Sequence, residues 1–218
     1  MPDGRVIQTY FSAKPPYKAQ WQIIIITGSL MLSATLGPNG LALVPDLSAS
    51  MNLIKEGQVW RLLTMLFVHR DLAHLGGNLF VLLPFTYSLL SYFQKRQIYA
   101  LALVSGLSAN YLTLLRLPGQ TQLLGISGLS YWAAGAWLTL FILIDTRKSL
   151  RRRISYAVFI SGMLLVPEKF SPDISYINHF WGLLFGVLCG LAIYKRNRQV
   201  IRAAEIYQKD EVEGEMPV

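Results

Sequence analysis

Residues 126–144 read ISGLSYWAAGAWLTLFILI, and these 19 residues include no Asp, Glu, Lys or Arg. An α-helix rises about 1.5 Å per residue, so an apolar run of about 20 residues can cross the hydrocarbon layer of a bilayer, which is about 30 Å thick. Because five more apolar stretches accompany this one, the chain is expected to be an all-α, polytopic membrane protein with a bundle of six transmembrane helices. The other stretches cover residues 21–43, 72–93, 98–116, 154–167 and 176–194.

The composition of the whole chain favours the same class of protein. Of its 218 residues, 53% are apolar or aromatic and only 15% are charged, whereas soluble domains carry about 25% charged residues. A soluble globular enzyme and a disordered chain are therefore both disfavoured. The net charge of +8 comes from Lys and Arg between the apolar stretches, so the expected anionic partner is the lipid bilayer and not nucleic acid.

The positions of Lys and Arg predict the direction of each span, because cationic side chains accumulate on the cytoplasmic side. With the amino terminus inside, 15 of the 20 Lys and Arg fall on that side and 5 on the other. Both termini are therefore expected in the cytoplasm. Three regions follow from this reading: a cytoplasmic segment over 1–20, a membrane domain over 21–195 and a cytoplasmic tail over 196–218.

The first apolar stretch and the segment after it need separate interpretation. The polar leader before residue 21 is long and no clear small-x-small site follows, so the stretch is interpreted as an anchor in preference to a cleaved signal peptide. The connection over residues 44–71 mixes polar and apolar residues, which is typical of a segment at the membrane interface. A long membrane-associated loop between helices one and two is therefore expected.

The tetrapeptide Gly125-Ile126-Ser127-Gly128 stands at the start of the fourth apolar stretch, and Tyr131 follows the serine at i+4, on the same helical face. Small residues beside a serine leave room for a substrate carbonyl, and a helix amino terminus offers free N–H groups where an oxyanion would form. The serine is therefore a candidate nucleophile. The alternative is that these small residues serve only close packing of helices.

Three histidines, His69, His74 and His179, lie at or just before the outer ends of helices two and six. Histidine in a membrane segment is by default a candidate functional residue, although a histidine hydrogen-bonded between packed helices is the alternative. A metal site is not expected, because the five-residue spacing of His69 and His74 would turn them to different faces of a helix. No cofactor is expected either.

Glycines follow His179 at a four-residue spacing, at Gly182, Gly186 and Gly190, and would permit close contact with another helix. If the fourth helix packs on these glycines, His179 comes close to Ser127, whose hydroxyl needs a neighbouring base to become a nucleophile. Tyr131 could then stack on the imidazole. The alternative is that the glycines serve packing alone and the histidine hydrogen-bonds elsewhere.

His74 and Asn78 are at i and i+4, so both side chains could donate hydrogen bonds towards one point. Two donors that converge in this way could stabilise an oxyanion. An ordinary buried polar network of histidine and asparagine is the alternative reading.

Together these elements resemble the rhomboid family of intramembrane serine proteases over roughly residues 55–195. No single motif is specific, but their order and spacing on helices two, four and six fit the family pattern. The resembling residues are Trp60, Arg61, His69, His74, Asn78, Gly125, Ser127, Gly128, Tyr131, His179, Gly182 and Gly186.

The resemblance implies a rhomboid-like bundle in which Ser127 and His179 form a catalytic dyad within a water-filled cavity near the outer surface. It implies that His74, Asn78 and the backbone N–H of Ser127 hold the oxyanion. Since no acidic residue lies in mid-helix near these positions, Tyr131 is expected to orient the imidazole in place of a carboxylate.

The resemblance also assigns roles outside the dyad. Trp60 and Arg61 would belong to a membrane-embedded loop, with Arg61 bracing Trp60 and its surroundings, and residues 167–172 would form a cap over the site. Asn178 departs from the family, which usually has a small residue there, and it could add a hydrogen bond or narrow the pocket on the S1 side.

The function expected from the resemblance is cleavage of single-pass membrane proteins near the outer face of a bacterial plasma membrane. Two other readings differ in class. An inactive relative that binds membrane clients typically lacks the serine or the histidine, and this chain has both. A transporter or channel would need polar residues along the full depth of a pathway, whereas here they gather at one end. The sequence leaves the oligomeric state open.

Overall fold

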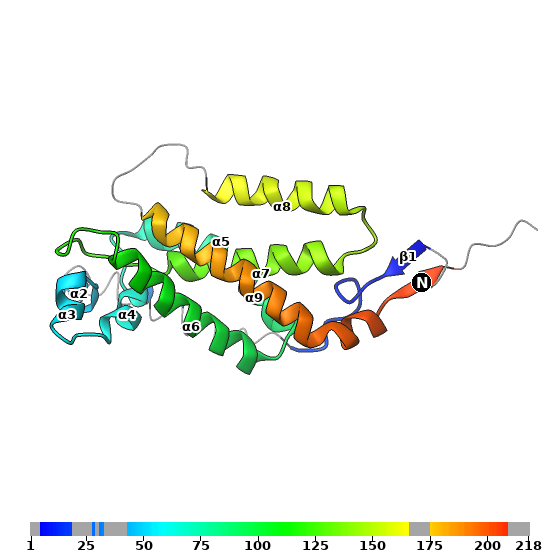
Figure 1. The fold of residues 1–218 in the computed structure, drawn as a ribbon, viewed down its shortest axis with the longest axis horizontal. Coiled ribbons are helices and arrows are strands. Elements are labelled where there is room, and N and C mark those ends of the chain that lie inside the picture. Colours follow the sequence, from blue (N-terminus) through cyan, green and yellow to red (C-terminus); the bar gives the residue numbers. More distant parts are fainter. Residues whose placement is uncertain (1–4, 19–27, 29–30, 33–42, 166–174, 209–218) are drawn as a thin grey trace, which may run out of the picture.

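The computed structural model describes residues 5–18, 28, 31–32, 43–165 and 175–208. Within these ranges the chain is mostly helical, and the long helices lie side by side as a bundle (Figure 1). The elements in chain order are β1 (Arg5–Gln8), α2 (Leu43–Leu47), α3 (Met51–Lys55), α4 (Arg61–Thr64), the 3-10 helix η1 (Met65–Phe67), α5 (Leu72–Tyr92), α6 (Lys95–Leu114), α7 (Ser127–Ile144), α8 (Leu150–Leu165), α9 (Tyr176–Ala203) and β2 (Ile206–Gln208).

Helix α7 is the centre of the bundle, because it contacts α5, α6, α8 and α9. The short helices α2, α3 and α4 lie at one end of the bundle, and β1 lies at the other (Figure 1). Buried residues occur along the whole of α7, from Ser127 to Ile144. This central position explains why the helix carries no charged residue, since an unpaired charge is costly to bury.

Five of the six expected apolar stretches coincide with the helices α5, α6, α7, α8 and α9. Within the described residues, α5, α7 and α9 are long and apolar enough to cross a membrane, judged by length and composition. The first expected stretch, 21–43, lies mostly outside the described residues, so the number of six spans stays a prediction. The expected connection 44–71 contains α3, α4 and η1, and most of α2. Helix α9 continues past residue 195, to Ala203.

The packing of α9 on α7 brings the two backbones into direct contact. A Cβ atom added to Gly182 would collide with the carbonyl oxygen of Gly128. One added to Gly190 would lie 2.8 Å from the carbonyl oxygen of Ala136, closer than real Cβ contacts. The four-residue spacing of the glycines therefore fixes one face of α9 on α7, and it aligns the first turns of the two helices.

Replacing Gly186 by alanine is expected to destabilise the bundle by about 2 kcal/mol, as overpacking of a tight contact does. The added Cβ would collide with the carbonyl oxygen of Trp132 and lie 2.9 Å from the backbone nitrogen of Ala136. Gly162→Ala in α8 is the matched control, because a Cβ there meets nothing within 4 Å and alanine favours helix by about 1 kcal/mol. Thermal unfolding in detergent should shift in opposite directions for the two variants. Equal melting temperatures would contradict the packing argument.

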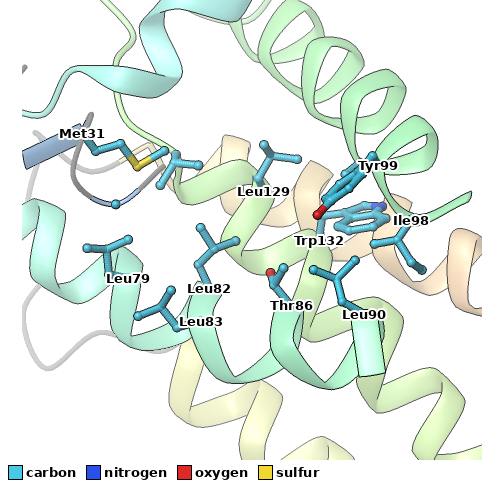
Figure 2. Close-up of a pocket in the computed structure, with 13 residues that line it drawn as sticks. Met31, Leu79, Leu82, Leu83, Thr86, Leu90, Ile98, Tyr99, Leu129 and Trp132 are labelled. Carbon is cyan, nitrogen blue, oxygen red and sulfur yellow. The ribbon is translucent and has the colours of Figure 1, made fainter. Parts of the chain in front are cut away.

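An apolar pocket of about 410 Å³ lies between α5, α6 and α7. Figure 2 shows the leucines of α5, including Leu79 and Leu82, on one side of it and Leu129 and Trp132 of α7 on the other. This pocket runs along α5 from Leu79 to Leu90.

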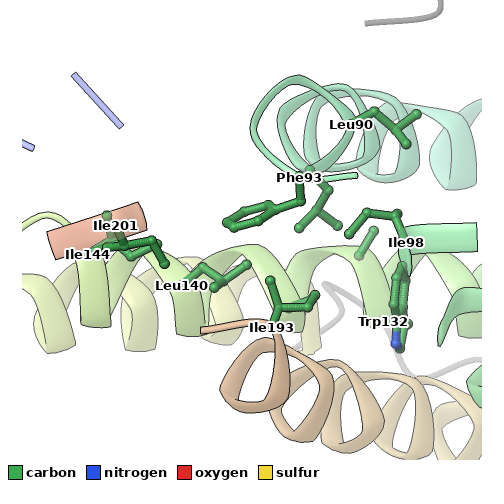
Figure 3. Packing of buried hydrophobic residues seen from close by; sticks show 11 residues of the cluster. Leu90, Phe93, Ile98, Trp132, Leu140, Ile144, Ile193 and Ile201 are labelled. Carbon is green, nitrogen blue, oxygen red and sulfur yellow. The ribbon is translucent and has the colours of Figure 1, made fainter. Parts of the chain in front are cut away.

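Among the described residues, the largest hydrophobic cluster lies beside this pocket, where α5 ends and α6 begins. Phe93 and Ile98 from this turn pack against Leu140 of α7 and Ile193 of α9 (Figure 3). All four side chains are almost completely buried. The cluster thus joins four helices at the end of the bundle that lies away from α2, α3 and α4.

At the same end, the first and last described segments form a small antiparallel sheet, with Val6 of β1 opposite Tyr207 of β2. After β1, the ring of Phe11 stacks on Trp137 of α7, with 4.4 Å between the ring centroids. The hydroxyl of Tyr10 donates to the carbonyl of Tyr92 at 2.6 Å. The two ends of the described chain are therefore held together and fastened to the bundle.

Candidate active site

A polar pocket of about 490 Å³ opens where α5, α7 and α9 begin. Ser127, His74, Asn78 and His179 all line it. These residues come from three different helices and were chosen from the sequence for their chemistry. The structure thus brings the candidate nucleophile, the candidate base and the two candidate oxyanion donors to one cavity.

Ser127 is the first residue of α7 and is 5% exposed. The turn before it contains Gly125 with φ of +100°, a conformation that other L-residues rarely adopt. Ile126 at the N-cap position provides no side-chain hydrogen bond to the helix. The N–H groups of the first turn therefore have no side-chain cap and are available to an oxyanion bound there.

Hydrogen bonds to the segment before α5 hold the turn that carries Ser127 in place. The N–H of Gly125 donates to the carbonyl of Met65 at 2.9 Å, and the N–H of Ile126 donates to Nε2 of His69 at 3.3 Å. Burial, together with the charge of His74, lowers the pKa of His69 to about 4. His69 is therefore neutral at pH 7, which leaves Nε2 able to accept this hydrogen bond.

The expectation that His69 and His74 occupy different faces of one helix is wrong. His69 precedes the N-cap residue Asp71, so it is not part of α5, and its ring contacts that of His74 edge-on with 5.2 Å between the centroids. Within the described residues, no group of three His, Cys, Asp or Glu side chains could hold a metal ion.

His179 is held face-on by the aromatic ring of Tyr131. The centroids of the two rings are 4.1 Å apart and the planes meet at 12°, so the rings are stacked. The hydroxyl of Tyr131 donates to the carbonyl of Leu164, near the end of α8, which fixes the phenol ring in turn. An imidazole in this position is oriented without a carboxylate. Among the described residues, no hydrogen bond joins His179 to Ser127.

His74 and Asn78 both lie against the turn at Gly125. A Cβ atom added to Gly125 would be 2.9 Å from Cε1 of His74 and 3.5 Å from Nδ2 of Asn78. Nδ2 of Asn78 is buried and donates to no acceptor in the described part of the chain. A buried donor without a protein acceptor, beside the first turn of α7, is suited to an oxygen atom of a bound ligand.

Two residues that support this arrangement were not found from the sequence. Asp71 caps α5 by accepting from the N–H of His74 at 2.7 Å, and this bond and the neighbouring Arg70 lower the pKa of the carboxyl group. Ser130 in α7 donates to the carbonyl of Asn78 at 3.1 Å, which joins α5 to α7. Aspartate is a preferred N-cap residue, so its position before α5 could have indicated the first role. Nothing in the sequence distinguishes Ser130 from other small helical residues.

Asn178 lies behind the site and does not line the polar pocket. It is fully buried, and its Oδ1 accepts from the hydroxyl of Thr113 in α6 at 3.2 Å. Its amide group also packs on Gly128, where an added Cβ would be 2.9 Å from Nδ2. Of the two effects considered from the sequence, the structure shows the added hydrogen bond.

Trp60 and Arg61 lie apart from the pocket, around the start of α4. The guanidinium of Arg61 donates to the carbonyls of Pro45 and Ser48, both at 2.9 Å, and to the side chain of Gln58. Trp60 is 56% exposed. Arg61 thus braces the backbone around α2. The expected cap over residues 167–172 lies outside the described residues.

Comparison with known proteins identifies the family. The model of the Rhomboid domain matches residues 56–196, a range that contains every residue of the polar pocket. RHOMBOID-like protein 5 of Arabidopsis thaliana is 26% identical over 162 residues, which are 74% of this chain and 52% of that protein. The chain thus spans about half the length of this curated relative. Given the matched domain and its apolar helices, the chain is an integral membrane protein that belongs to the rhomboid family.

Proposed function

We propose that this protein is an intramembrane serine endopeptidase that cleaves membrane-anchored proteins with a Ser127–His179 dyad. The observation that carries the proposal is the convergence of these two residues with His74 and Asn78 on one polar pocket. An inactive, client-binding relative would have no need for all four groups together. A channel is disfavoured because the pocket is confined to one end of the bundle.

In the proposed reaction, His179 takes the proton of the Ser127 hydroxyl as the oxygen attacks a peptide carbonyl of the substrate. The carbonyl becomes a tetrahedral oxyanion, which His74, Asn78 and the N–H of Ser127 stabilise. The imidazolium then gives its proton to the leaving amine, and an acyl-enzyme remains. Water, deprotonated by His179, hydrolyses the acyl-enzyme and restores the serine.

The hydrogen bond between serine and histidine must form for this reaction. Catalytic hydrogen bonds are often long in free enzymes and tighten when substrate binds. Ser127 and His179 line the same cavity, so rotation of the Ser127 side chain about its Cα–Cβ bond is the proposed route to this hydrogen bond. We infer that an occupied pocket selects this rotamer.

The proposed substrates are single-pass membrane proteins cut near the outer membrane face. A peptide bond within a helix is hidden, because its carbonyl accepts a backbone hydrogen bond, so the cleaved segment must be unwound. The distribution of Lys and Arg supports cytoplasmic termini, and with them an outward-facing pocket. The proposed location is a bacterial plasma membrane.

The proposal is tested by reacting the purified full chain with a serine-directed fluorophosphonate and locating the adduct by mass spectrometry. We expect one adduct, on the peptide that contains Ser127, and none on protein denatured before the reaction. Folded protein that forms no adduct, or forms it on another serine, would overturn the assignment of the nucleophile.

Replacing Asn78 by alanine should lower kcat by about 10²-fold, the scale of a single oxyanion donor, with a much smaller change in KM. The effect arises because the amide is expected to bind the oxyanion more strongly than the ground-state carbonyl. Asn197→Ala, at the far end of α9, is the matched control and should leave kcat unchanged. Cleavage kinetics with a fluorogenic transmembrane substrate provide the measurement. An unchanged kcat in Asn78→Ala would remove this residue from the mechanism.

A further inference from the structure

A cationic pocket of about 420 Å³ lies where the chain turns from α5 into α6, at the end of α5 remote from His74. Three exposed cationic side chains line it, Lys18, Lys95 and Arg96, together with the apolar Leu90. No acidic residue lines the pocket, and within the described ranges none of the three cations forms an ion pair. The pocket is therefore suited to an anion.

The helix that begins at this pocket adds to the positive potential. Lys95 is the first residue of α6, which has 20 residues, and the N-cap residue Gln94 provides no side-chain hydrogen bond. The N–H groups of the first turn thus have no side-chain acceptor, and the helix dipole places partial positive charge at the same point. Three side-chain cations and a helix amino terminus converge on one cavity.

The apolar pocket adjoins the cationic pocket at the almost completely buried side chain of Leu90, and Gly28 and Met31 of the first apolar stretch line its other side. Leu90 lines both this pocket and the apolar pocket of Figure 2, which extends along α5 past Thr86 and Leu83 to Leu79. The 11 residue steps from Leu79 to Leu90 correspond to about 16 Å of helix, close to half of a hydrocarbon layer about 30 Å thick. The groove therefore has the length that one acyl chain occupies in one leaflet.

We propose that the two adjoining pockets bind one anionic phospholipid. Its phosphate lies among Lys18, Lys95 and Arg96, and one acyl chain lies along the groove from Leu90 to Leu79. The charge of the pocket favours a lipid with net negative charge over a zwitterionic one, and the apolar groove favours a lipid over free phosphate. The site is independent of the proposed proteolysis, because it uses none of the residues assigned to the reaction.

The proposal is tested by titrating the purified, delipidated full chain with dioleoyl phosphatidylglycerol, dioleoyl phosphatidylcholine or inorganic phosphate. Native mass spectrometry counts bound molecules, and thermal unfolding reports stabilisation. We expect one phosphatidylglycerol to bind about tenfold or more tightly than phosphatidylcholine, and to raise the melting temperature. Equal binding of the two lipids would overturn recognition of charge. If inorganic phosphate bound as tightly as phosphatidylglycerol, the proposal that the ligand is a lipid would be overturned, and the site would be one for free anions.

Two double variants test whether the lipid binds at this pocket. Lys95→Gln combined with Arg96→Gln should weaken phosphatidylglycerol binding about tenfold, since each cation near a membrane surface contributes to the attraction. The matched control, Arg151→Gln with Arg152→Gln, removes two exposed charges from the start of α8 and should leave the affinity unchanged. Equal weakening in both double variants would show general attraction to the surface and overturn the site.

A third variant tests the groove separately from the charge. Thr86→Trp would fill the groove where the acyl chain is placed, and it should weaken phosphatidylglycerol binding with all three cations intact. Circular dichroism and the melting temperature without lipid check that this variant is folded. A folded Thr86→Trp protein with unchanged affinity would overturn the placement of the acyl chain.

Discussion

Substituting Ser127 by alanine is expected to lower substrate turnover by about 10⁴-fold or more and to abolish the reaction with fluorophosphonate, as loss of the nucleophile does in other serine proteases. The alanine side chain retains Cβ, so the packing beside the turn changes little. Within the described residues, the Ser127 hydroxyl forms no hydrogen bond. The free energy of unfolding of the variant should therefore lie within about 1 kcal/mol of the wild-type value.

The matched control for this substitution is Ser155→Ala. Ser155 is an exposed residue of α8 whose hydroxyl donates only to the carbonyl of Arg151. Full turnover is expected in this variant. The turnover of both variants is measured by cleavage of a transmembrane substrate in proteoliposomes. Turnover retained in a folded Ser127→Ala protein would exclude the serine as nucleophile, and another hydrolytic group would have to be sought in the pocket.

The second large effect is expected for His179→Ala, which should also lower turnover by about 10⁴-fold or more. The serine would keep its hydroxyl but lose the base that accepts its proton. Because nucleophile and base act as one unit, the double variant Ser127→Ala/His179→Ala should be no slower than either single variant. Additive losses would contradict a shared step.

Tyr131→Phe separates stacking from the hydrogen bond to Leu164. Phenylalanine keeps a ring on the imidazole of His179, so turnover should fall by less than about tenfold. Tyr131→Ala removes the ring as well, and turnover should fall further in this variant. Equal losses in the two variants would show that the hydroxyl, rather than the stacked ring, is the part of Tyr131 that positions the histidine.

The long helices were predictable from the sequence because their physical cause is local. Residues 126–144 form an uninterrupted apolar run, and the structure has α7 over Ser127–Ile144. The glycines at 182, 186 and 190 predicted a close helix neighbour, and they lie against the backbone or side chains of α7. An apolar run and a periodic row of small residues both report what surrounds a helix, so each could be interpreted without coordinates.

The remaining features depend on contacts between distant residues or on the exact start of a helix. The charged residues after 195 suggested a tail, although α9 continues to Ala203, because hydropathy marks the edge of the apolar layer and not the end of a helix. The faces of His69 and His74 were misjudged because α5 begins only after Asp71. The bond between Tyr131 in α7 and Leu164 in α8 joins two residues that are 33 positions apart in the chain, and no local pattern predicts it.

The antiparallel pairing of β1 with β2 has a consequence for biosynthesis. The first strand leaves the ribosome about two hundred residues before its partner, so it can find that partner only after all the helices between them have been synthesised. Closure of this small sheet therefore cannot precede the synthesis of α9. A protein stalled or truncated within α9 would leave the opening strand exposed, and quality-control proteases would encounter it there.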